Sequence, residues 1–171
     1  MPEEGLALER WANFYLIAST AAATLIGLLF ILITLAAEKR PKDVTKIGLY
    51  LTPTVVYFGS VLLLAALLTF PNQSRFTAAL CICGLGSLGL LYSVSMVARK
   101  EKFLQRSDAI QYVVYPLAAY GVLVWGGLLL DHMAQRGLTL VAVGMVALIT
   151  LAVRNSWGIA VDVVSSPHKD R

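Results

Sequence analysis

Charged side chains are scarce in this sequence. They make up 14% of its 171 residues, against 58% hydrophobic residues, and the mean hydropathy is +0.74. In soluble proteins the charged residues alone amount to about a quarter of the chain. Long polar segments are missing too, so no part of the chain is left over for a soluble domain. These absences exclude an ordinary soluble globular protein and indicate a membrane protein.

Cysteine and histidine are also rare, with two of each. Cys81 and Cys83 are two positions apart, a spacing that suits neither a disulfide nor a Cys-x-x-Cys redox site, and we interpret them as small packing residues. His132 and His168 do not give the paired membrane histidines of a haem or metal site. A Ser-His-Asp pattern, a glycine-rich phosphate loop and paired intramembrane carboxylates are missing as well. The sequence therefore predicts no catalytic residue, cofactor or metal, and a protein that is not an enzyme.

What is abundant is apolar sequence, which forms five runs at 14–37, 47–70, 76–98, 109–131 and 137–161. Each run reaches the ~20 residues that a helix needs to cross a hydrocarbon core ~30 Å thick. Acidic residues precede the first run where a signal peptide would be basic, so we expect this helix to be retained. The sequence predicts an all-α, polytopic membrane helical bundle with five transmembrane helices, in which residues 1–171 form a single transmembrane domain.

Lysine and arginine are unevenly divided between the two ends of these helices. Of the 14, only three lie in the N-terminal tail and in the loops after the second and fourth helices: Arg10, Arg75 and Arg136. The positive-inside rule then predicts an N-terminus outside and a C-terminus in the cytoplasm. We interpret the basic loops as topology signals that contact anionic lipid headgroups of the bilayer. No soluble basic face with stacking aromatics accompanies them, so we expect no nucleic-acid partner.

A weak internal repeat links the helices in pairs. Tyr57 follows Pro53 by four residues in the second helix, and Tyr120 follows Pro116 by four residues in the fourth. The first and third helices share a Gly-Leu-Leu-aromatic pattern, at 27–30 and 89–92. These similarities predict a possible tandem repeat of two hairpins plus a fifth helix, an arrangement found in transporters, although chance similarity among apolar helices gives the same pattern. Both prolines predict kinks, which serve either packing or gating.

Small residues recur on the first helix at four-residue spacing and on the third helix in a cluster: Ser19, Ala23 and Gly27, and Gly84, Gly86 and Gly89. Small residues let the backbones of membrane helices approach closely. We therefore expect the first and third helices to pack closely, at the centre of the bundle or of an oligomer interface.

The polar residues inside the apolar runs are the candidate functional cluster: Arg154, Asn155, Asp162, Tyr57 and Tyr120. The two tyrosines lie near mid-membrane, where each hydroxyl needs a partner. Arg154 lies near the cytoplasmic headgroups, and Asn155 requires a hydrogen bond to avoid a cost against lipid. Two interpretations remain open for the end of the fifth helix: an interfacial anchor with a structural hydrogen-bond network, or a functional polar site.

The helix-1 run WANFYLIASTAAATLIGLLFILITL resembles the start of a group of small bacterial five-helix inner-membrane proteins. The segment RNSW at 154–157, in the fifth apolar run, is similar to an Arg-Asn-Ala-Trp-Asp stretch at the end of those chains, with Gly158 where that pattern has Asp. The resemblance implies residence in a bacterial inner membrane and five helices. Some members of the group are labelled modulators of the FtsH protease.

Two functions from different classes follow from these features. In the first, the chain is a non-catalytic accessory, assembly or modulatory subunit that binds other membrane proteins, or further copies of itself, through helix–helix contacts. In the second, it forms a homo-oligomeric channel or small-solute transporter with a polar site near the inner end of the fifth helix. A water-filled cavity lined by Tyr57, Tyr120 and Asn155 would favour transport, whereas separate local hydrogen bonds would favour the accessory subunit.

Overall fold

The computed structural model describes the backbone of residues 2–39, 44–71, 73–100 and 113–165, and the side chains of residues 10–38, 52–71, 73–96 and 113–161. Within these ranges the fold is all-α and has five helices. They are α1 (Pro2–Lys39), α2 (Val44–Leu68), α3 (Arg75–Lys100), α5 (Tyr115–Leu129) and α6 (Ala134–Ser165). The all-α fold class is therefore confirmed. Asp162 of the candidate cluster lies outside the described side chains.

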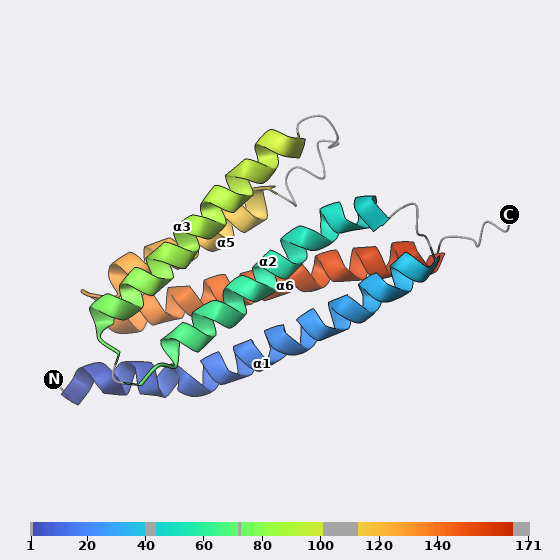
Figure 1. The fold of residues 1–171 in the computed structure, drawn as a ribbon. Coiled ribbons are helices and arrows are strands. Elements are labelled where there is room, and N and C mark those ends of the chain that lie inside the picture. The colour runs from blue at the N-terminus through green and yellow to red at the C-terminus, as the bar shows by residue number, and fades with distance from the viewer. Residues whose placement is uncertain (1, 40–43, 72, 101–112, 166–171) are drawn as a thin grey trace, which may run out of the picture.

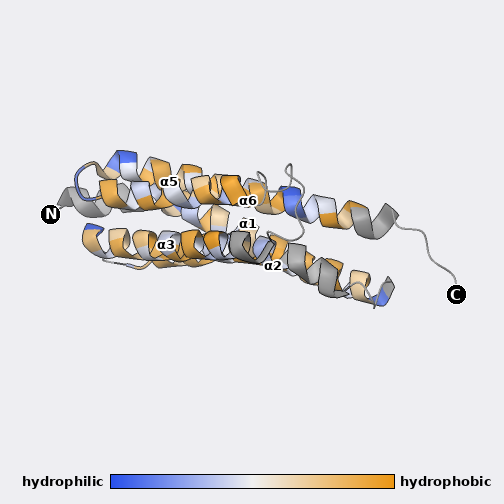
Figure 2. Ribbon diagram, turned by 90° about the horizontal axis from the view of Figure 1, so that it is seen from above, coloured by the Kyte–Doolittle hydropathy of each residue, from blue (hydrophilic) through white to orange (hydrophobic). Residues whose placement is uncertain are grey.

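Three of these helices are long and apolar enough to cross a membrane. By length and composition they are the segments Arg10–Glu38, Arg75–Met96 and Ala134–Val161, while Thr52–Leu68 and Tyr115–Leu129 are shorter apolar segments. The hydropathy colouring in Figure 2 shows hydrophobic residues along most of each helix and hydrophilic residues gathered near helix ends. Large apolar side chains point outward: Ile17 is 69% exposed and Trp157 is 72% exposed. Such an apolar exterior is the pattern expected of a protein surrounded by lipid.

Local sequence signals explain where α2 ends and α3 begins. Pro71 follows α2 closely and disfavours a helical conformation in the residue before it. Ser74 then precedes α3, and its Oγ accepts a hydrogen bond of 3.1 Å from the backbone N–H of Thr77. This contact satisfies one of the N–H groups that a helix start leaves without an intrahelical partner. The turn between α2 and α3 is therefore set by a proline and a serine cap.

The helices form an elongated bundle (Figure 1), and among the described helices α6 has substantial contact with α1, α2 and α5. The helix pairs with substantial contact are α5–α6, α1–α2, α3–α5, α2–α6, α1–α6 and α2–α3. Helices α1 and α3 lie along opposite edges of the bundle and are not among these pairs. The expected close packing of the first and third helices within one chain is therefore wrong.

The core lies between the five described helices, and α3 contributes Ala78 and Ile82 to it. Its largest fully buried side chains include Tyr15, Phe58, Tyr120 and Met145. Glycines bring α5 and α6 together: a Cβ on Gly126 would lie 2.9 Å from the carbonyl oxygen of Gly137, closer than real Cβ contacts. The α5–α6 pair is thus built on direct backbone approach, as small-residue packing in membranes favours.

Candidate functional site

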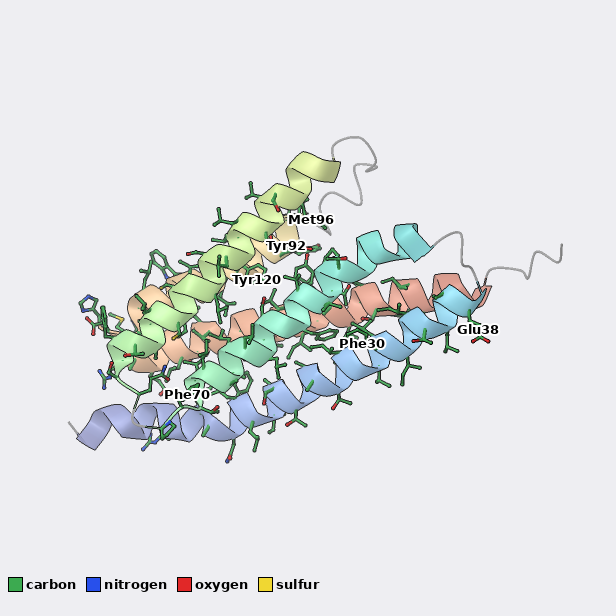
Figure 3. The ribbon with its side chains drawn as sticks, viewed as in Figure 1. Phe30, Glu38, Phe70, Tyr92, Met96 and Tyr120 are labelled. Carbon is green, nitrogen blue, oxygen red and sulfur yellow. The ribbon has the colours of Figure 1, made fainter. Side chains whose placement is uncertain are left out.

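The two tyrosines that the sequence predicts at mid-membrane depth lie together inside the bundle. Tyr57 of α2 is 2% exposed and Tyr120 of α5 is fully buried. Their ring centroids are 6.3 Å apart, with a 59° angle between the ring planes. Figure 3 shows Tyr120 between α3 and α2. The structure therefore places both predicted residues in one aromatic contact between α2 and α5.

The hydroxyl of Tyr120 has a partner that the sequence did not point to. Its oxygen lies 2.9 Å from Ser60 Oγ of α2. Ser60 in turn donates to the carbonyl oxygen of Val56 at 2.8 Å. Because a serine hydroxyl has a single proton, Tyr120 is the donor to Ser60. The result is a short hydrogen-bond chain from Tyr120 through Ser60 to the α2 backbone.

Helix α3 packs against Tyr120 through its glycines. The Tyr120 ring occupies the space that a Cβ on Gly89 would need, and a Cβ on Gly86 would lie 2.7 Å from Cγ2 of Val124. Ser93, one turn further along α3, donates to the carbonyl oxygen of Gly89 at 2.8 Å. Gly86 and Gly89 thus pack α3 against α5 and not against α1, because the aromatic ring of Tyr120 fills the groove that these glycines leave.

The remaining small residues of the prediction face outward. Ala23, Gly27 and Gly84 are exposed, and a Cβ on either glycine would meet no atom within 4 Å. Ser19 is half-buried and donates to the carbonyl oxygen of Leu16 in its own helix at 2.9 Å. Helix α1 instead turns Ala18, Ala22 and other side chains to the core. This outward row on α1 (Ser19, Ala23, Gly27) is called the α1 small-residue face below.

The two prolines have different positions in their helices. Pro53 is buried inside α2, where a proline removes one backbone hydrogen bond. Pro116 is buried in the first turn of α5, directly after a π-helical step at Val113 and Val114. The first turn of a helix tolerates proline, because the N–H groups there have no intrahelical partner.

Arg154 and Asn155 are neighbours in α6 but point into different surroundings. Arg154 is exposed, whereas Asn155 is only 4% exposed. The Oδ1 atom of Asn155 is buried and has no hydrogen-bond partner among the described residues. Arg154 and Asn155 do not join Tyr57 and Tyr120 in one cavity: the tyrosines form their own buried contact, while Arg154 lines an outward groove.

That groove lies between α5 and α6 and has a volume of about 430 Å³. Its walls come from Tyr115, Ala118, Ala119 and Val122 of α5 and from Val143, Gly144, Ala147, Thr150, Leu151 and Arg154 of α6. Except for Tyr115, Thr150 and Arg154, these residues are apolar. We call this feature the α5–α6 groove. The sequence was not interpreted as forming a groove here, although the spacing of Val143, Ala147, Thr150 and Arg154 places them on one helix face.

The described part of the chain offers no metal centre. No group of three or more histidine, cysteine, aspartate or glutamate residues there could hold a metal ion. Cys81 and Cys83 are free thiols, and Cys83 Sγ lies 3.8 Å from the carbonyl oxygen of Val124 at the α3–α5 contact.

Comparison of the chain with models of protein families, with curated proteins and with solved structures found no match. The resemblance to small inner-membrane proteins therefore stays a prediction.

Proposed function

We propose that the chain is a multi-pass integral protein of a bacterial inner membrane. All five helices would cross the bilayer, with the N-terminus outside and the C-terminus in the cytoplasm. Support comes from the three helices of membrane-spanning length, the apolar exterior and the uneven distribution of lysine and arginine. The tandem repeat remains a proposal that rests on the sequence pattern.

Within that membrane the chain acts as a non-catalytic accessory, assembly or modulatory subunit that binds another membrane protein through helix–helix contacts. The observation that carries this proposal is the α1 small-residue face. Of the three membrane-length segments, Arg10–Glu38 has the smallest buried share. Ala23 and Gly27 leave open space on its exposed side, and small residues at four-residue spacing are the pattern by which membrane helices associate.

The use of the buried hydroxyls supports an accessory subunit over a transporter. Tyr120 bonds Ser60, and Ser60 bonds its own helix, so these groups are occupied within the bundle. The α5–α6 groove has neither tyrosine of the candidate cluster among its lining residues. A solute path would instead need polar side chains that face a shared aqueous space.

Native mass spectrometry of the protein, extracted gently from its own membranes, tests this proposal. We expect one copy bound to a different membrane protein. Gly27→Leu fills the open space on α1 and should remove that partner. Gly158→Leu is the matched control, because Gly158 of α6 is also exposed with nothing within 4 Å of its Cβ position. A complex that survives Gly27→Leu unchanged would overturn the role of the α1 small-residue face.

A second candidate function is a homo-oligomeric channel or small-solute transporter. It is favoured by Asn155, whose buried Oδ1 has no described partner and which follows the exposed Arg154 in the chain. A closed homo-oligomer in the mass spectrum would support this candidate, since identical subunits around an axis can enclose a path. The double replacement Arg154→Leu and Asn155→Leu then separates the two roles: lost flux in liposomes with unchanged assembly indicates a transport site, and lost assembly indicates a structural pair.

A further inference from the structure

The α5–α6 groove is a lengthwise furrow with one charged end. On α6 it follows a single helix face from Val143 through Ala147 and Thr150 to Arg154. The facing wall on α5 includes Ala118, which is exposed. Small side chains on both helices leave the space open. The hydroxyl of Thr150 donates to the carbonyl oxygen of Val146 at 2.8 Å, so its proton is used within α6.

The length of the groove matches one leaflet of a bilayer. Val143 and Arg154 are eleven residues apart, which at ~1.5 Å per residue is about 16 Å along the helix axis. The hydrocarbon core of a bilayer is ~30 Å thick, so one leaflet contributes about half of that. Arg154 also lies about 30 Å from Ala134, the first residue of α6. A chain that begins at Arg154 and runs to Val143 would therefore lie in the leaflet to which Arg154 belongs.

The walls of the groove favour one kind of occupant. The space lies between the side chains of two helices that contact each other, and its described walls are apolar apart from Tyr115, Thr150 and Arg154. A single hydrocarbon chain is the narrow apolar object that a membrane supplies. A charged residue at one end of an apolar groove suits an acyl chain with a polar headgroup better than it suits an apolar helix of a second copy.

The positive charge of Arg154 at one end of the groove favours one class of lipid headgroup. Arg154 is exposed, and none of the described residues that line the groove is acidic. Its guanidinium group presents a planar fork of donors that matches the oxygens of a phosphate. A zwitterionic lipid would place its own cation near this positive charge, whereas an anionic headgroup complements it. Tyr115, at the start of α5, is 46% exposed and lines the same groove.

We propose that the α5–α6 groove binds one anionic glycerophospholipid, with an acyl chain between α5 and α6 and the phosphate on Arg154. This proposal rests on the membrane placement given under Proposed function. It does not depend on whether the chain acts as an accessory subunit or as a transporter.

Native mass spectrometry of the detergent-purified chain tests the site with two lipids of equal chain length, phosphatidylglycerol and phosphatidylcholine. We expect one phosphatidylglycerol molecule to be retained in clear preference. Arg154→Gln should weaken its binding about tenfold and remove the preference, because a charge-assisted hydrogen bond is lost. Arg136→Gln is the matched control, since Arg136 is exposed at the opposite end of α6 and should leave binding unchanged.

A second variant tests the apolar part of the groove. Ala118→Leu should lower the retention of both lipids by filling the space, while Ala66→Leu at an exposed alanine of α2 should lower neither. Thermal unfolding of each variant shows whether the bundle is intact. Equal retention of the two lipids by the unaltered chain, or full phosphatidylglycerol binding by Arg154→Gln, overturns the proposal. So does a dimer that Ala118→Leu abolishes, because the occupant is then a second copy.

The membrane placement has a separate readout. A chain that is released from membranes by alkaline washing contradicts the placement itself. A chain that stays in the washed membranes, yet shows no preference for phosphatidylglycerol, contradicts the lipid site alone.

Discussion

Glycines and small residues line the contacts of helix α5 with α3 and with α6, and one stretch of each contact gives the opposite result. Toward α3, Gly86 and Gly89 admit the side chains of Val124 and Tyr120, and no space is left. Toward α6, Ala118 and Ala147 leave an outward groove of about 430 Å³. The comparison shows that small residues alone do not determine contact. What fills the space is decided by the side chain opposite, which is a ring in one case and another alanine in the other.

Enlarging a residue on the filled side should have the largest effect. Gly89→Leu places its side chain where the Tyr120 ring lies, so we expect a loss of about 3 kcal/mol in the free energy of unfolding, measured by denaturant titration in mixed micelles. Gly84→Leu on the same helix is the control and should change stability little, because Gly84 has nothing within 4 Å. Equal stability of Gly89→Leu and Gly84→Leu would contradict the close packing of the Tyr120 ring against Gly89.

Asn155 lies on the buried side of α6, whereas the adjacent Arg154 is exposed. Its buried Oδ1 has no described partner, so Asn155→Leu should raise the free energy of unfolding of the isolated chain by about 1 kcal/mol. The same micelle titration on Arg154→Leu should show a smaller change, since Arg154 is exposed. A marked loss of stability in Asn155→Leu would mean that the amide is hydrogen-bonded in the folded chain.

The Tyr120 hydroxyl should contribute less than its ring. Tyr120→Phe keeps the ring against Gly89 and removes the hydrogen bond to Ser60, which should cost about 0.6 kcal/mol, the average for such bonds between membrane helices. A double-mutant cycle with Ser60→Ala measures the coupling between the two hydroxyls. Additive effects of the two replacements would show that the bond contributes nothing to stability.

Filling the open side should have the smallest effect on stability. Ala118→Leu adds its side chain to an empty groove, so we expect a change below about 0.5 kcal/mol while lipid retention falls. Gly89→Leu should therefore lower stability more than lipid retention, and Ala118→Leu should lower lipid retention more than stability. A large loss of stability in Ala118→Leu would mean that the groove closes in the membrane.

The sequence of this chain indicates where its helices lie, but not which helices pack against each other. Apolar runs located all five helices, since ~20 apolar residues suffice to indicate a span. The structure extends α1 back to Pro2 and α6 on to Ser165, because polar residues continue these helices beyond the apolar runs. Which helices touch was predicted wrongly for the first and third. A membrane helix is apolar on every side, so its sequence carries little record of which face is inward.

The candidate site, too, could be predicted from the sequence only in part. The need of Tyr120 for a hydrogen-bond partner followed from its depth in the apolar run, whereas its partner Ser60 depended on the packing of α5 near α2. The outward direction of Gly27 and the inward direction of Gly89 could not be told apart, because both are glycines in apolar helices with similar neighbours. The α5–α6 groove needs the relative register of two helices, which no single run of sequence contains.

Tyr120 links two helices, α5 and α2, that otherwise have little contact with each other. Helices α2 and α5 are not among the pairs with substantial contact, yet the Tyr120 ring lies beside Tyr57 and its hydroxyl reaches Ser60. This side chain therefore adds a direct link between α2 and α5, beside the contacts that α2–α3, α2–α6 and α5–α6 make. Inserting one residue into α5 just before Tyr120 would rotate the ring by about 100° relative to the preceding turn. The ring would leave both Gly89 of α3 and Ser60 of α2, so the α3–α5 packing and the contact with α2 would be lost together.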